Sequence, residues 1–259
     1  GKNAVNTYGE SITVFFDYFL KGKDNGFIDS KRIRYFNIGD DNWREADEWP
    51  PVSVETQSYY LNANNKLSKN FPDQNSITSY KYDPSNPITI TEGTNVWQRS
   101  AEMRDRSVLL EREDVITFET EELNTDTEIT GNIILELFAS SSAIDTDFTA
   151  AIVDVYPNGY SLLIQEGILR ASHRNKHEKP SHINPNEVYQ FDIDLWATSY
   201  IIPKGHKLRL EVSSSNFPRF ARNLNNGESI GLSSDIVIAE QKIYYGKEYP
   251  SKILLPVNK

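Results

Sequence analysis

The sequence predicts an all-β protein: a jelly-roll β-sandwich that carries one α-helix at its N-terminal end. From about residue 29 onward, apolar and polar residues alternate with a period of two in about ten segments rich in β-branched and aromatic residues, as half-buried strands require. Gly, Pro, Asn and Asp separate these segments. Because the intervening stretches show little helical periodicity, a sandwich is favoured over a parallel α/β sheet.

The single predicted helix lies within residues 7–26. Its apolar residues recur at spacings of three and four, at Ile12, Phe15, Phe16, Phe19 and Leu20. Either Gly22 or Gly26 can end the helix in a left-handed cap. Such a helix has one broad apolar face, which needs a partner to cover it.

The strand candidates occupy ten segments: residues 32–39, 77–83, 114–120, 129–141, 146–156, 160–172, 188–201, 206–215, 235–245 and 251–257. In the segment 206–215, three apolar residues alternate with three charged ones: Leu208, Leu210 and Val212 with Lys207, Arg209 and Glu211. We therefore expect one covered face and one solvent face there. The Asn158-Gly159 pair after Pro157 is the signal of a type I′ hairpin.

The composition indicates a soluble protein, which we expect to be cytoplasmic. The formal charge of -10 and the pI near 5.0 argue against nucleic-acid and anionic-membrane partners, which need clustered cations. No apolar run approaches the length of a membrane span, and no secretory pattern opens the sequence. The absence of cysteine excludes disulfides and thiolate metal sites. Since the chain begins at Gly1 and its only methionine is Met103, we expect a cut end with more sequence upstream.

Ser229 lies in Gly-Glu-Ser-Ile-Gly, a formal match to the nucleophile elbow of serine hydrolases. An elbow needs a buried strand before the serine and a helix after it. Here an Asn-rich polar loop precedes Ser229 and a strand-like segment follows it. All four histidines precede the serine, whereas the elbow's histidine follows it. The sequence therefore favours a polar connection over a catalytic serine.

Other chemistry-bearing residues have ordinary structural interpretations. His173, His177 and His182 fall in a Pro-, Asn- and Lys-rich segment that predicts an exposed loop rather than a metal site, and His206 fits a turn before a strand. Two acidic pairs each share a strand face: Asp145 with Asp147, and Asp192 with Asp194. Such pairs could bind calcium or act as a glycosidase pair, but turn capping and pairing with arginine are favoured. We expect no metal and no cofactor.

Several strings, in order along the chain, resemble the X-Pro dipeptidyl-peptidase / cocaine esterase family (CocE/NonD hydrolases). They include "VFFDYFLKGKDNG", "YFNIGDDNWREADEWPP", "REDVITFETEEL", "EITGNIILELFASSSAIDTDFTAAIVDVYPNG", "IDLWATSYIIPKGHKLRLEVSSSNFPRFARNLN" and "YPSKILLPV". The resemblance covers nearly the whole chain, but only the C-terminal part of such enzymes.

The resemblance implies a galactose-binding-domain-like jelly roll, residues 29–259, without catalytic residues of its own. Residues 1–28 would be the last helix and linker of an α/β-hydrolase domain whose Ser-Asp-His triad lies upstream of Gly1. That domain of the same polypeptide would be the partner, and a small ester or peptide would be its substrate. The resemblance does not decide between X-Pro peptides, aryl esters and β-lactams as the substrate. It also does not decide whether the protein forms homo-oligomers.

In the family, the connection before the "R-x-D-V" strand can reach over the hydrolase pocket. Here that connection is residues 88–106, and Val96 and Trp97 are the candidates for the pocket wall. Trp43 and Trp49 fit a domain interface or core better. The alternative is a self-standing carbohydrate-binding jelly-roll module, in which Trp43, Trp49, Trp97 and Trp196 would line a sugar-binding face.

Overall fold

The computed structural model describes residues 2–5, 7–89, 105–175, 179–229 and 231–259. Its helices are α1 (Tyr8–Lys21) and the short 3₁₀ helices η1 (Phe27–Asp29), η2 (Arg106–Glu111) and η3 (Ala171–His173). Its strands are β1 (Ile33–Asn37), β2 (Asn42–Ala46), β3 (Val54–Asn62), β4 (Lys66–Ser68), β5 (Ser76–Tyr82), β6 (Ile116–Glu119), β7 (Thr127–Ser141), β8 (Asp147–Val155), β9 (Ser161–Arg170), β10 (Tyr189–Ile202), β11 (Lys207–Ser213), β12 (Ala239–Tyr245) and β13 (Lys252–Asn258).

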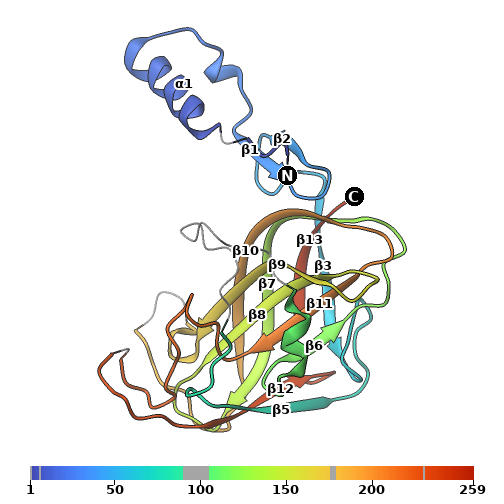
Figure 1. Ribbon diagram of the computed structural model, residues 1–259, viewed down its shortest axis with the longest axis vertical. Helices are drawn as coiled ribbons and strands as arrows, with labels where there is room; N and C mark the ends of the chain where they lie inside the picture. The colour runs from blue at the N-terminus through green and yellow to red at the C-terminus, as the bar shows by residue number, and fades with distance from the viewer. Residues whose placement is uncertain (1, 6, 90–104, 176–178, 230) are drawn as a thin grey trace.

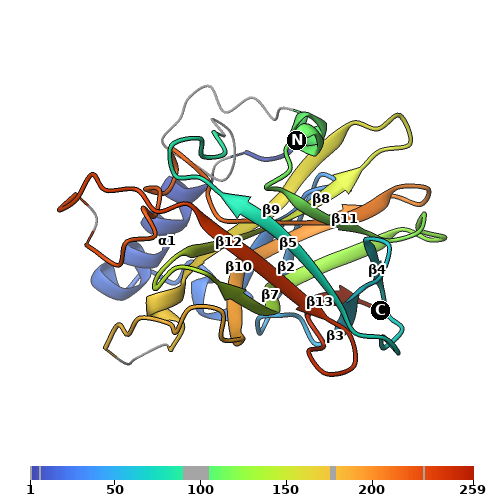
Figure 2. The same ribbon diagram turned by 90° about the horizontal axis from the view of Figure 1, so that it is seen from below.

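The strands form a jelly-roll β-sandwich, as predicted (Figure 1). One hydrogen-bonded path runs β5-β12-β7-β13-β3-β4-β6-β11-β8-β9, and β10 also pairs with β7. The path turns back on itself, so that β8, β9 and β11 cover β7 and β10 (Figure 2). β7 is the central strand of its layer. β10 pairs with it along nearly its whole length on one edge, and β12 and β13 share its other edge.

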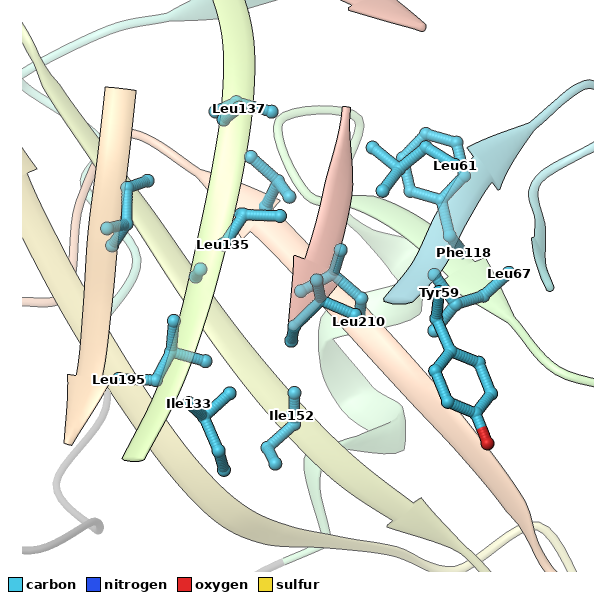
Figure 3. Close-up of a cluster of buried hydrophobic side chains, with 14 of the residues drawn as sticks. Tyr59, Leu61, Leu67, Phe118, Ile133, Leu135, Leu137, Ile152, Leu195 and Leu210 are labelled. Atoms are coloured by element: carbon cyan, nitrogen blue, oxygen red, sulfur yellow. The ribbon is translucent and has the colours of Figure 1, made fainter. Parts of the chain in front are cut away.

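The core lies between these two layers. Residues Ile133, Leu135 and Leu137 of β7 alternate toward it and are fully buried, as period-two patterning predicts. Ile152 of β8 and Leu210 of β11 meet them from the other layer (Figure 3). At roughly 2 kcal/mol for each fully buried aliphatic side chain, this interface is the main source of stability.

The backbones of β9 and β10 lie close together at Gly167. A Cβ atom on Gly167 of β9 would lie 2.1 Å from the carbonyl oxygen of Asp194 and 3.1 Å from the Cα of Leu195. Next to this approach β10 has a bulge between Asp194 and Ala197, and the Gln165 side-chain amide donates to the Ala197 carbonyl at 3.1 Å. Only glycine fits at position 167 without moving backbone.

All ten strand candidates contain a strand, and the helix is confirmed with Gly22 as its left-handed cap (φ 64°). Strands β2, β3 and β4 were not predicted. The candidate at 235–245 forms a strand only from Ala239, so residues 235–238 lie outside any strand.

The hairpin between β8 and β9 differs from the predicted type I′ turn. The Tyr156 N–H donates to the Tyr160 carbonyl at 2.9 Å, and of the three residues between them only Gly159 has a positive φ, 88°. The Gly159 N–H donates to the Tyr156 carbonyl at 2.9 Å, as in a type I turn that ends in a left-handed glycine. Pro157 and Asn158 are the central residues of this observed turn, and the fixed negative φ of Pro157 fits the first central position of a type I turn.

The N-terminal elements attach to the sandwich through the β1–β2 hairpin, which lies between the sandwich and α1 in Figure 1. The Ile38 N–H donates to the Ser199 carbonyl at 2.9 Å, and the Ile201 N–H donates to the Ile38 carbonyl at 3.0 Å. The Asn37 side-chain amide donates to the Ser199 hydroxyl at 2.8 Å. The hairpin is thus a separate two-stranded sheet that an isolated bridge between Ile38 and Tyr200 joins to β10.

Gly167→Ala should lower the free energy of unfolding by about 3 kcal/mol, because its methyl group would enter the backbone of β10. Urea denaturation measures the change. Gly9→Ala in α1 is the matched control, since a Cβ atom added at Gly9 would meet nothing within 4 Å, and this variant should lose no stability. A loss below about 0.5 kcal/mol for Gly167→Ala would contradict the close approach.

Candidate functional site

The segment that carries Val96 and Trp97 lies outside the described residues, but both of its ends are described. At one end the Ile88 N–H donates to the Ser215 hydroxyl at 2.9 Å, and the Phe217 N–H donates to the Ile88 carbonyl at 2.9 Å. At the other end a carboxylate oxygen of Asp105 accepts from the N–H of Ser161 at 2.9 Å. Both ends are therefore fastened to the layer that contains β8, β9 and β11.

A buried charge cluster fixes the helix that follows this segment. Arg106 of η2 donates to one oxygen of Glu211 from Nε at 2.9 Å and from Nη2 at 2.7 Å. Arg209 donates from Nε to the other oxygen at 3.1 Å. All three side chains are almost fully buried. Because a buried charge is stable only when it is paired, η2 is held over β11 in one position.

This cluster corrects the prediction for residues 206–215. Arg209 and Glu211 were expected to face solvent, yet they are 1% and 3% exposed. The alternation itself is right, because Leu208, Leu210 and Val212 face the core. Both faces of β11 are covered. The helix η2 lies on the face that carries Arg209 and Glu211, and its Arg106 pairs with Glu211.

A second polar cluster joins β8, β10 and the start of β11. The fully buried carboxylate of Asp154 lies 2.7 Å from Nδ1 of His206 and accepts from the Tyr200 hydroxyl at 2.8 Å. The ring of Tyr156 packs on His206 with centroids 4.4 Å apart. Burial, and then the adjacent carboxylate, raise the pKa of Tyr200, so its hydroxyl stays protonated and donates. The sequence identified His206 only as a turn residue and did not identify its partner Asp154, whose signal is a lone carboxylate within an apolar strand.

The two acidic pairs have different surroundings. Arg170 donates to both oxygens of Asp147, at 2.8 and 3.2 Å, which confirms the predicted arginine pairing. Asp145 is buried and accepts from the Ser172 N–H at 2.9 Å. Asp192 and Asp194 are exposed on β10. Within the described residues, no three His, Asp or Glu side chains gather where they could hold a metal ion.

Ser229 lies in an exposed loop between β11 and β12, so neither a strand before it nor a helix after it forms an elbow. It lines two open cavities of about 350 and 430 Å³, the larger of which also includes His173 and His182. Both of these imidazole rings have other partners: the Ser172 hydroxyl at 3.1 Å and the Gly227 carbonyl at 3.1 Å. His177 lies outside the described residues. The structure therefore supports the interpretation of the residues around Ser229 as a polar loop rather than a nucleophile elbow.

The three tryptophans in the described part of the chain have different surroundings. Trp43 and Trp49 are half-buried in the β1–β2 region, where Trp43 donates to the Asn3 carbonyl at 3.1 Å and Trp49 to the Asn132 side chain at 3.3 Å. Trp196 is different: it lies at the β10 bulge with a φ of 68° and is 65% exposed. Trp97 lies outside the described residues.

A sequence profile of the X-Pro dipeptidyl-peptidase C-terminal non-catalytic domain matches residues 25–254. The chain belongs to this family. It is accordingly a non-catalytic C-terminal domain of the X-Pro dipeptidyl-peptidase / cocaine esterase hydrolases, as the sequence strings indicated. The family profile begins after α1, so the helix lies outside it.

The chain spans about half the length of the following three relatives. The cocaine esterase of Rhodococcus sp. (strain MB1 Bresler) is 33% identical over 282 residues, which cover 100% of this chain and 49% of the esterase. A selenomethionine-labelled α-amino acid ester hydrolase superimposes with a TM-score of 0.82 at 27% identity, over 95% of this chain and 44% of that one. An aminopeptidase from a marine sediment Thaumarchaeota archaeon shares the fold, with a TM-score of 0.85 at 24% identity, over 98% of this chain and 44% of that one.

Arg106→Met should lower the free energy of unfolding of this domain by about 3 kcal/mol, because it leaves Glu211 buried with a weaker set of partners. Arg112→Met is the control. That side chain is 25% exposed and pairs with Asp114, so its loss should cost about 1 kcal/mol or less. Urea denaturation of both variants checks the difference, and equal losses would show that the Arg106 pair does not hold η2.

Proposed function

We propose that this domain packs on an α/β-hydrolase domain of the same polypeptide and helps to wall its substrate pocket. The parent would be a serine hydrolase that cleaves ester or amide bonds through an acyl-enzyme. The observation that carries the proposal is α1, a well-formed amphipathic helix none of whose residues is buried.

The apolar side chains of α1 support this assignment. Phe16, Phe19 and Leu20 are all exposed, Leu20 by 75%. Part of the aromatic surface packs locally, since Phe15 and Phe27 of η1 have ring centroids 5.4 Å apart. The helix α1 itself lies away from the sandwich in Figure 1. An exposed apolar patch of this kind is typical of a surface that another domain covers, so we assign residues 1–28 to the hydrolase domain and its linker, and 29–259 to the jelly roll.

The anchored ends of the segment before η2 support the pocket-wall role. Val96 and Trp97 remain the candidates, and their segment starts at Thr89 and ends at Asp105, two points held on one rigid layer. Loops that a scaffold anchors at both ends commonly carry binding residues. Apolar side chains at an acyl-transfer site exclude water without taking part in the chemistry.

One observation favours the rival function, a carbohydrate-binding module: the exposed ring of Trp196 in a backbone conformation that is rare for tryptophan. Isothermal titration with oligosaccharides distinguishes the two functions. Heat of binding that is lost in Trp196→Ala would favour the module, whereas the hydrolase proposal expects no binding.

The 259-residue chain should hydrolyse p-nitrophenyl acetate no faster than buffer, and Ser229→Ala should not change its rate. The polypeptide that includes the hydrolase domain is the positive control. Turnover by the short chain that disappears in Ser229→Ala would overturn the assignment of the triad to the upstream domain.

In the polypeptide that includes the hydrolase domain, Trp97→Ala should lower kcat/KM for its ester substrate about tenfold, which corresponds to about 1.4 kcal/mol of transition-state binding. Trp196→Ala removes an equally large side chain from β10 and serves as the control. If both variants keep wild-type kcat/KM, Trp97 does not wall the pocket.

A further inference from the structure

A small cavity lies between η2 and the layer that contains β8, β9 and β11. Its volume is about 20 Å³. Part of its lining is apolar, where Ile88, Leu109 and Val115 form a buried cluster of their own. The polar part includes the side chains of Arg106 and Asn216. A polar cavity of roughly 10–15 Å³ is enough for one water molecule, so this one holds a single water and no organic ligand.

Arg106 supplies a hydrogen-bond donor that needs a partner. Two of its three guanidinium nitrogens, Nε and Nη2, donate to Glu211. The third, Nη1, is buried and has no hydrogen-bond partner among the described residues. Arg106 as a whole is only 6% exposed. Because an unpaired buried donor on a charged group costs more free energy than a neutral one, an acceptor close to Nη1 is expected.

Asn216 supplies the matching acceptor. Its side-chain amide donates from Nδ2 to Glu166 at 2.9 Å. Its Oδ1 is buried and accepts no hydrogen bond within the part of the chain that the structure describes. Asn216 is 5% exposed. One unpaired donor and one unpaired acceptor therefore belong to side chains that line the same small cavity.

The charges around the cavity indicate what it holds. Both carboxylates that line it are already paired: Glu211 with Arg106 and Arg209, and Glu166 with Arg219. A cation would lie against the guanidinium of Arg106, and an anion would lie against the two carboxylates. Neither is favoured where charges are buried. A water molecule carries no net charge and both donates and accepts, as the two unpaired atoms require.

We propose that this cavity is the binding site of one ordered water molecule. The water accepts a hydrogen bond from Nη1 of Arg106 and donates one to Oδ1 of Asn216. This inference is independent of the proposed function, because every residue that lines the cavity lies within the jelly roll.

The water joins two polar clusters that have no direct contact through these atoms. One is the Arg106–Glu211–Arg209 cluster, and the other consists of Glu166, Asn216 and Arg219. Together they form one hydrogen-bond network across β9 and β11. Buried polar networks are rigid when every member is satisfied, and the water satisfies the last donor and the last acceptor of this pair.

The same water connects the two ends of the segment that carries Trp97. Arg106 follows that segment directly. Asn216 precedes Phe217, which forms an isolated bridge with Thr89 at the start of the segment. The water therefore lies at the base of the segment and fixes its two ends relative to each other.

A crystal structure of the polypeptide that includes the hydrolase domain, at a resolution that shows ordered waters, tests the proposal. The expected result is a water within about 3 Å of both Nη1 of Arg106 and Oδ1 of Asn216. A cavity without density would overturn the proposal. Density that contacts only one of the two atoms, or a direct hydrogen bond between them, would also overturn it.

Urea denaturation gives a second test. Arg106→Met and Asn216→Leu each remove one partner of the water, so the second substitution removes a water that is already lost. The double variant should therefore lose clearly less stability than the sum of the two single losses. Asn223→Leu is the matched control, because Asn223 is also a buried asparagine, 6% exposed, and does not line the cavity. Its loss should add to that of Arg106→Met. Additive losses for Arg106→Met and Asn216→Leu would contradict a water that joins them.

Discussion

The pairing of Arg106 with Glu211 fixes η2 on β11, next to the segment that we propose as a wall of the substrate pocket. It buries two opposite charges between η2 and β11, where neither can be left alone without a large desolvation cost. Because η2 follows directly on the segment that carries Trp97, this pair determines where that segment ends. Asp105 and the Ile88–Ser215 contact complete the attachment to the same layer. The sandwich thus acts as a rigid support for a loop whose proposed work lies in another domain.

Two further parts of the surface also expose apolar side chains: α1 and the segment before β12. The β1–β2 hairpin is bridged to β10 and lies between the sandwich and α1. Asn225 and Asn226 donate to the backbone of a separate segment with exposed apolar side chains, residues 235–238. Both features would be costly in a domain that worked alone, because exposed apolar surface favours association. The proposed packing on a hydrolase domain gives such exposed apolar surface a use. No helix in the described part of the chain combines the length and apolarity of a membrane span.

Local sequence patterns predicted most of the fold. Periodicity of two identified the core strands, since Ile133, Leu135 and Leu137 alternate toward a buried layer. It did not identify β2 or β4, which are short and polar and exist because β1 and β3 offer them partners. The same limit applies to the site. Ser229 could be set aside from its flanking sequence, but the partners of Arg106 and His206 lie 105 and 52 residues away, and no local pattern reports such a pair.

A crystal structure of the polypeptide that includes the hydrolase domain, trapped as an acyl-enzyme analogue, tests the central claim most directly. Our account predicts that α1 is buried within the hydrolase domain and that Val96 or Trp97 lies within about 4 Å of the acyl group. A structure in which α1 remains exposed, or in which the jelly roll contributes no side chain to the pocket, would contradict it.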